Sequence, residues 1–264
     1  MNGASLSTLL NAIGPAKVTG FFLVLGRIAP LFVLAPLFSS TMVPPKVRTI
    51  VAVGLSIGLT PLAVHGQPVP TSPLAVAALM IEQVLVGLAF ATAVGAVFAA
   101  VEAAGSLTDL VAGFSFGQML DPVDNTQSGP MTSLYSIVGL ALFIAIGGDA
   151  WLLRGLARTF SLVPLTKGPQ IASLTSGVES AVASIFVSAV EVAAPVLLAV
   201  LITDVAFGMV SRVVPQFNVF AVGFPMKIGV AFLTVSAALP FLGGFMSNQI
   251  AGAVTTALHS LSIG

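Results

Sequence analysis

The sequence is short of charge. Only 7% of its 264 residues are Asp, Glu, Lys or Arg, whereas 57% are hydrophobic and the mean hydropathy is +1.10. About a quarter of the residues in a soluble domain are charged, so this chain cannot cover a water-facing surface and we expect it in or against a lipid bilayer. Its nine basic and nine acidic residues cancel, which gives no electrostatic reason to bind nucleic acid.

Cysteine is absent, which excludes a disulfide framework and a thiolate metal site. The two histidines, His65 and His259, have no neighbouring ligands at the spacing of a metal site. No phosphate-binding loop of the type GxxxxGK[ST] occurs. We therefore expect no cofactor and no nucleotide hydrolysis. The segment Met1 to Ala16 has no cationic stretch ahead of an apolar core, so we expect no cleavable signal peptide.

What the chain does have is long apolar runs without strand-like alternation, rich in Leu, Ala, Val and Gly. A helical span needs about 20 such residues, and the pattern predicts helices rather than barrel strands. The fold class is an all-α membrane protein with long kinked helices and helical hairpins. The expected helices cover residues 10–38, 47–64, 74–108, 131–146, 151–163 and 170–213, with a last one from residue 224.

The central stretch from Asp109 to Pro130, DLVAGFSFGQMLDPVDNTQSGP, interrupts the apolar runs. It has three acidic residues, no basic residue and an apolar centre, so it is more than a linker. We divide the chain into N-terminal helices at 1–108, this central loop at 109–130 and C-terminal hairpins at 131–264. Glycines at 105, 113 and 117 are expected to give its backbone room to shift.

A small-residue stripe and several charges stand out within the predicted helices. Gly87, Ala91, Gly95, Ala99 and Ala103 recur every fourth residue, which predicts a long contact with another helix. Asp149 is expected to cap the helix that carries Arg154 and Arg158 on one face, four residues apart. Glu82 and Glu102 are 20 residues apart, close to opposite faces of a helix. They do not form one proton relay.

Arg27 and Glu191 each lie close to a helix-kinking proline. Arg27 must find a partner, either the carbonyl region at Gly26 that Pro30 frees or an acid on another helix, because a buried unpaired guanidinium is too costly. Glu191 precedes Pro195 by four residues, which places a freed carbonyl and a carboxylate at one level. An ion pair with Arg27 or Arg154 is the simplest interpretation of that acid.

The pentapeptide Gly113-Phe114-Ser115-Phe116-Gly117 matches the GxSxG nucleophile elbow, and His259 follows downstream. That motif needs a strand-to-helix turn, and the chain offers no predicted strand. Ser115 is better explained as a local capping or packing residue, and we expect no enzyme activity.

Three passages resemble the FliR family, the flagellar export-gate proteins of type III secretion, whose cousins are the SctT injectisome proteins. They are GRIAPLFVLAPLFSSTMVPPKVRTIVAVGLS from Gly26, the stretch from Asp109 to Leu165, and APVLLAVLITDVAFGMVSRVVPQFNVFAVGFPMKIGV from Ala194. The last, with SRxxPQxNxFxxGFP, is the most specific. Gly117 stands where the family more often has Ala.

The resemblance implies a subunit of a pseudo-helical, multi-subunit export gate in the bacterial inner membrane, within the flagellar basal body. Its partners would be FliP, FliQ and FlhB, and unfolded export substrates would cross the membrane through the shared pore. Such an assembly would explain why the basic clusters do not fit one simple topology. The family's plug loop corresponds to 105–122, and the pore-plug residues would be Gly113, Phe114, Phe116, Gly117, Met119 and Leu120. Bulky apolar side chains in a narrow pore exclude water and ions. The alternative is a loop that packs against its own helices.

The remaining charges are assigned to subunit packing or ion pairs: Arg27, Glu102, Glu191, Asp204 and Arg212. A rival function is a secondary transporter with broken helices and intramembrane carboxylates, in which Glu191, Asp204 and Arg212 would line a substrate site. It predicts an internal two-fold repeat, which the sequence does not show.

Overall fold

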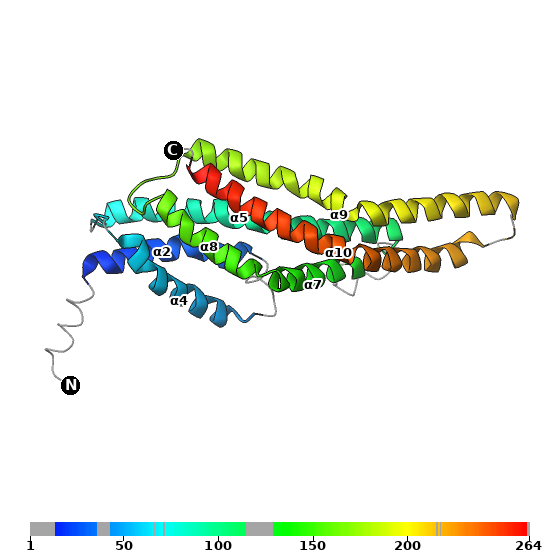
Figure 1. The fold of residues 1–264 in the computed structure, drawn as a ribbon, viewed down its shortest axis with the longest axis horizontal. Helices are drawn as coiled ribbons and strands as arrows, with labels where there is room; N and C mark the ends of the chain where they lie inside the picture. The colour runs from blue at the N-terminus through cyan, green and yellow to red at the C-terminus, as the bar shows by residue number, and fades with distance from the viewer. Residues whose placement is uncertain are drawn as a thin grey trace, which may run out of the picture. The chain divides into compact units, whose positions relative to one another are not determined.

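The computed structural model describes residues 14–35, 43–65, 67–70, 72–114, 129–214, 216 and 218–262. These residues form helices and no strand, which confirms the all-α fold class. The helices are α2 (Pro15–Leu34), α4 (Pro45–Val64), α5 (Pro73–Ala112), α7 (Pro130–Ala145), α8 (Gly148–Leu162), α9 (Ile171–Val213) and α10 (Val219–Ser262) (Figure 1).

Four of these helices begin at a proline: α2, α4, α5 and α7. Proline suits the first helical position because its missing N–H has no partner there in any case and its φ is already helical. The prolines at 15, 45, 73 and 130 therefore explain where these helices start.

Four predicted helix starts lie within two residues of the observed ones, two differ by three residues or more, and the predicted start at residue 10 lies outside the described residues. α10 begins at Val219 rather than Phe224, because Asn218 Oδ1 accepts a hydrogen bond of 3.1 Å from the Ala221 N–H and so caps an earlier start. α8 begins at Gly148, so Asp149 lies in its first turn and is not its cap. A carboxylate there still interacts favourably with the positive end of the helix dipole.

Among the described residues, five helices are long and apolar enough to cross a membrane, namely α2, α4, α5, α9 and α10, and α7 with α8 qualifies only as a pair. The chain is a membrane protein on this criterion. α5, α9 and α10 have 40, 43 and 44 residues. At 1.5 Å per residue each is about 60 Å or longer, about twice the hydrocarbon thickness.

The helices contribute to two compact units. Unit 1 takes its described residues from 1–95, 149–181 and 251–264, and unit 2 takes its own from 96–148 and 182–250. The boundaries fall inside α5, α9 and α10, so each of these helices contributes to both units.

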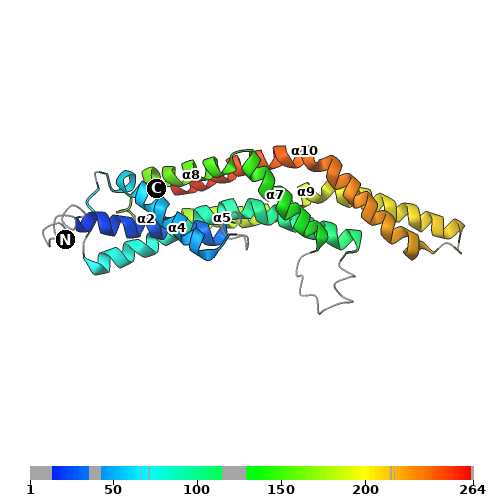
Figure 2. The ribbon, with the colours of Figure 1, turned by 90° about the horizontal axis from the view of Figure 1, so that it is seen from below.

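Unit 1 packs α2 against α4 and the first part of α5 (Figure 2). Its core includes Leu23 and Ile28 of α2, which are fully buried. A Cβ on Gly87 would lie 2.9 Å from the carbonyl carbon of Arg27, and one on Gly95 would lie 3.3 Å from the Leu34 oxygen. The predicted small-residue stripe is therefore a helix contact at both glycines.

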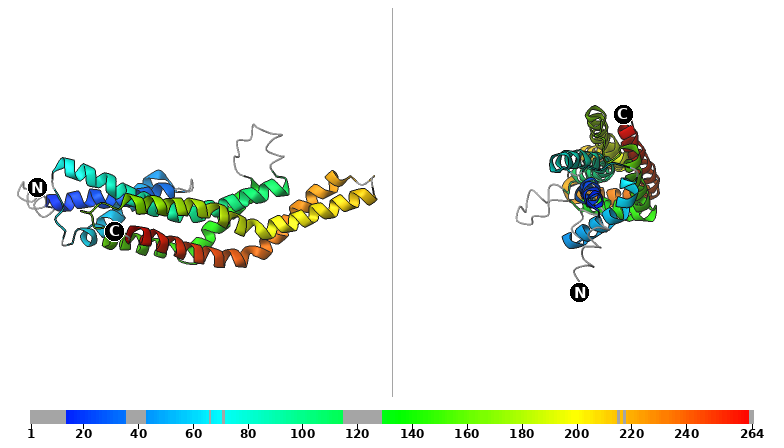
Figure 3. Two further views of the ribbon diagram at one scale, coloured as in Figure 1. Left: turned by 90° about the horizontal axis from the view of Figure 1, so that it is seen from above. Right: turned by 90° about the vertical axis from the view of Figure 1, so that its left-hand side faces the viewer.

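Unit 2 contains the end of α5, α7 and an antiparallel hairpin formed by α9 and α10, which lie side by side in all views (Figure 3). The rings of Phe98 and Phe143 meet edge to face with centroids 5.1 Å apart. Met131 and Met246 are fully buried.

Candidate functional site

The central stretch is the strongest candidate for a functional site, and the structure describes both of its ends. Gly113 and Phe114 belong to the described residues, whereas Ser115, Phe116, Gly117, Met119 and Leu120 lie outside them. The assignment of Phe116, Gly117, Met119 and Leu120 to a pore plug therefore stays a prediction.

Gly113 ends α5. Its φ of +91° is in the left-handed region that favours glycine. The N–H groups of Gly113 and Phe114 both donate to the carbonyl of Asp109, at 3.1 and 3.0 Å. This is the usual geometry of a glycine helix stop, so Gly113 fixes a turn.

Phe114 is half-buried in unit 2. Its ring meets the ring of Phe232 of α10 edge to face, with centroids 6.5 Å apart and an interplanar angle of 86°. This contact agrees, at Phe114, with the alternative that the loop packs against its own helices. Its place in a pore plug stays a prediction.

Asp109 joins the two ends of the stretch. Its carboxylate is 5% exposed and accepts three hydrogen bonds from the start of α7. The Met131 N–H donates to Oδ1 at 2.9 Å, while the Thr132 N–H and hydroxyl donate to Oδ2 at 2.9 and 2.6 Å. A carboxylate at a helix N-terminus satisfies otherwise unpaired N–H groups and faces the positive end of the helix dipole. We call this set Asp109, Met131 and Thr132 the α5–α7 clasp.

Two glycines allow the α5–α7 clasp to close. A Cβ on Gly105 would lie 2.6 Å from the Thr132 Cα, and a Cβ on Gly129 would collide with the Asp109 carboxylate. Gly105 lies inside α5, where the missing Cβ allows close contact with α7. The expectation that it gives the backbone room to shift stays a prediction.

Arg27 forms the second polar site, in unit 1, and is fully buried. Its Nε donates to Gln83 Oε1 at 2.8 Å, with Nη2 also directed at that oxygen. Nη1 donates to the Thr159 carbonyl and Nη2 to the Val163 carbonyl, both at 2.9 Å. The guanidinium carbon lies 4.5 Å from the centroid of the Phe160 ring, a distance typical of a cation–π contact.

The observed partners of Arg27 are not the two that the sequence suggested. An amide of α5 and carbonyls at the end of α8 hold the charge, and neither Gly26 nor an acid is among the bonds of this cluster. Carbonyls at a helix C-terminus lack intrahelical donors and carry the negative end of the dipole. The sequence signalled that Arg27 needs a partner, but nothing in it identified Gln83 or Thr159.

The three residues of the rival transporter site do not come together. Glu191, Asp204 and Arg212 lie on one continuous helix, α9. They are separated by 13 and 8 residues, which is about 20 and 12 Å along the axis. Asp204 instead forms an ion pair with Lys227 of α10, a partner that sequence reasoning did not name.

Glu191 is exposed and lines a hollow of about 440 Å³ in unit 2. The other lining residues come from α10 and include two amides, Asn248 and Gln249, beside Phe241 and Phe245. Arg212 is exposed on the same helix, too far along it to reach Glu191. Glu102, on α5 of this unit, is also exposed.

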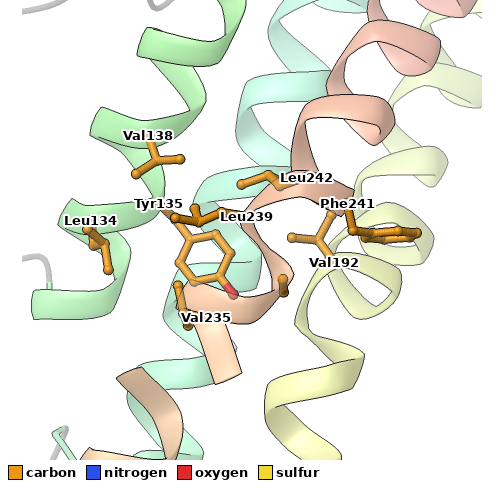
Figure 4. A pocket seen from close by; sticks show the side chains of 9 residues that line it. Leu134, Tyr135, Val138, Val192, Val235, Leu239, Phe241 and Leu242 are labelled. Carbon is orange, nitrogen blue, oxygen red and sulfur yellow. The ribbon is translucent and has the colours of Figure 1, made fainter. Parts of the chain in front are cut away.

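A separate apolar recess in unit 2 lies between α7, α9 and α10 (Figure 4). Tyr135 is the one side chain with a polar atom among its lining residues, which include Leu134, Val192 and Leu239. Its volume of about 10 Å³ is at the lower limit for holding a single water, so the recess is a gap in packing.

The arrangement offers no constellation for catalysis or metal binding within the described residues. No group of three or more His, Cys, Asp or Glu side chains gathers there, and His65 and His259 are both exposed. What the described residues do provide is two buried polar clusters that fix helix ends, one in each unit.

Comparison with known proteins gives one consistent result. The family model described as bacterial export proteins, family 1, matches residues 18–253. The chain is 29% identical over 234 residues to the flagellar biosynthetic protein FliR of Pectobacterium carotovorum subsp. carotovorum, covering 88% of both chains. It is 28% identical over 250 residues to FliR of Bacillus subtilis (strain 168), covering 92% of this chain and 95% of the relative.

The similarity extends to a second group of relatives. The chain is 24% identical over 209 residues to the surface presentation of antigens protein SpaR of Salmonella typhimurium, covering 78% of each. The match therefore covers most of both units.

Proposed function

Because the chain belongs to the family of bacterial export proteins, family 1, we propose that it is a subunit of the flagellar type III export apparatus. The observation that carries this proposal is the similarity to FliR proteins over 88% or more of both chains in two relatives. The lower coverage of the SpaR relative, 78% of this chain against 88% and 92% for the two FliR relatives, favours flagellar over injectisome use. The apparatus would lie in the bacterial inner membrane, at the flagellar basal body.

The subunit would line part of a pore with FliP and FliQ and be contacted by FlhB. Large apolar side chains are exposed along the α9–α10 hairpin, among them Phe186, Leu198, Leu233 and Phe241. In a membrane assembly such surfaces face lipid or other helices. The exposed Glu191 carboxylate, with no cation of its unit in reach, supports a contact in which another subunit supplies a basic side chain.

The central stretch would help to seal this pore. The α5–α7 clasp supports the proposal, because it ties the end of α5 to the start of α7 and so fixes the two points between which the central stretch is attached. Bulky apolar groups such as Phe116, Met119 and Leu120 would exclude water and ions by dewetting. No catalytic step is involved.

The test is co-purification of the full chain with its neighbours. An affinity-tagged chain expressed with the flagellar genes of its own organism should recover several copies of two small helical membrane proteins, the FliP and FliQ homologues. Transport or tight binding of a small solute by the lone chain, with no co-purifying partner, would support the transporter instead.

A matched pair of variants sharpens that test. Glu191→Lys places a like charge against the basic residue expected from the partner and should lower the recovery of partners. Glu179→Lys, at an exposed acid of α9 that is not assigned to subunit packing, serves as the control.

A further inference from the structure

The outer side of α8 carries an exposed stripe of Trp151, Arg154, Arg158 and Ser161. Their spacing of three, four and three residues places all four within a sector of about 80° at 100° per residue. Trp151 is 49% exposed and is the one tryptophan of the whole chain. We call these four residues the outer stripe.

The opposite side of α8 is anchored in unit 1. Leu152 and Leu156 are 1% exposed, and a Cβ on Gly155 would lie 2.7 Å from a Val254 methyl group. Arg27 holds the carbonyls of Thr159 and of the residue after the helix, Val163. Because this side and the C-terminal end are fixed, the outer stripe faces away from its own unit.

The two arginines of the outer stripe are not neutralised within the described part of their unit. Neither side chain has an ion pair there. The nearest acid on α8 is Asp149, which lies on the far side of the helix from the stripe. The helix neighbours three and four positions away are not acidic: Ala150, Trp151, Ala157, Gly155, Ser161 and Leu162.

We propose that the outer stripe binds the headgroups of anionic phospholipids at the membrane surface. A guanidinium forms paired hydrogen bonds with phosphate oxygens, and Arg154 and Arg158 are about 6 Å apart along the axis. Tryptophan is enriched where a protein meets the boundary between headgroups and acyl chains. α8 is also the least apolar and the most two-sided of the helices in the described residues, as expected of a helix that lies in that boundary.

An acidic protein surface is the competing occupant for two arginines. The exposed indole favours the bilayer, because its apolar ring and polar N–H match the two sides of the lipid interface. This site is independent of the export function proposed above and would act in any assembly that leaves α8 at the bilayer surface.

The single tryptophan makes the test specific for this site. The full chain is reconstituted into vesicles of phosphatidylcholine and phosphatidylglycerol in which one of the two lipids carries brominated acyl chains, and the fluorescence of Trp151 is measured. Brominated phosphatidylglycerol should quench Trp151 more strongly than brominated phosphatidylcholine at the same mole fraction. The preference should weaken with added salt.

Two double variants separate this site from general charge effects. In Arg154→Gln with Arg158→Gln, the relative affinity for phosphatidylglycerol should fall by about thirty-fold, which corresponds to about 1 kcal/mol for each basic residue near an anionic surface. Lys46→Gln with Arg212→Gln removes two exposed positive charges elsewhere and should keep the preference. Both pairs change exposed residues, and thermal unfolding in detergent checks that each variant folds.

Equal quenching by the two lipids in the unaltered chain would overturn the proposal. A preference for brominated phosphatidylglycerol that is unchanged in the double variant Arg154→Gln with Arg158→Gln would also overturn it. If Trp151 is quenched by neither lipid, and that variant also recovers fewer partner proteins, the outer stripe faces an acidic protein surface and the lipid assignment is wrong.

Discussion

Arg27 shows how a single charge can be kept inside an apolar unit without an acid. Five hydrogen-bond contacts to neutral oxygens and one aromatic face surround the guanidinium. The planar fork of arginine bridges α5 and the end of α8 at once. A lysine carries the same charge on a single nitrogen and cannot reach both helices in the same way.

We therefore predict that Arg27→Lys lowers the free energy of unfolding by about 2–4 kcal/mol, because bonds to a buried charged group are worth about 1.5–3 kcal/mol each and some must be lost. Denaturant unfolding in detergent measures the change. Arg212→Lys, at an exposed arginine, is the control and should change the free energy by less than about 0.5 kcal/mol. Equal effects of the two substitutions would contradict this account of Arg27.

At the scale of elements, the α5–α7 clasp sets the spacing of two helices that flank the central stretch. One carboxylate satisfies the first N–H groups of α7 from the last turn of α5. An asparagine at 109 would offer one acceptor oxygen and present an NH₂ group to the remaining donors. It would also remove the charge that the helix dipole favours.

Asp109→Asn should accordingly reduce the free energy of unfolding by about 2–3 kcal/mol. Thr132→Val removes one of the three bonds and should have a smaller effect, about 1 kcal/mol. Glu102→Gln on the same helix, at an exposed acid, provides the control. The clasp would lose its assigned role if Asp109→Asn unfolded like Glu102→Gln.

For the whole molecule, the pore plug can be tested without disturbing the ends of the central stretch. Gly113 caps α5 and Phe114 packs on Phe232, so the replacement is confined to 115–120. A Gly/Ser segment of equal length removes Phe116, Met119 and Leu120 and should raise ion leakage through the assembled gate, since dewetting no longer closes the path.

The control for that experiment replaces residues 123–128 by the same Gly/Ser segment and leaves the apolar centre in place. Conductance or small-molecule efflux in membranes that contain the assembled complex is the measurement. Unchanged permeability after the 115–120 replacement would remove the plug assignment while leaving membership in the export apparatus intact.

The sequence was sufficient for the helices and the family, and insufficient for the polar contacts. The apolar runs predicted four of the helix starts to within two residues, and the small-residue stripe predicted the contacts at Gly87 and Gly95. Partners such as Gln83 for Arg27 depend on how α2, α5 and α8 pack together, and a single sequence does not show which side chains that packing brings into contact. The packing role of Gly105 could not be predicted for the same reason: flexibility and close packing both favour glycine, and the close approach of Thr132 is visible only in the structure.

The bonds of Arg27 also bear on how the chain is made. Its partners Gln83, Thr159 and Val163 follow it by 56, 132 and 136 residues. At roughly 5–20 residues per second of synthesis, roughly 7 to 27 seconds separate the emergence of Arg27 from that of its α8 carbonyls. During this interval α2 holds a guanidinium without its final partners, and water or the insertion machinery must solvate that charge. α2 can therefore reach its final packing only after more than half of the chain has been translated.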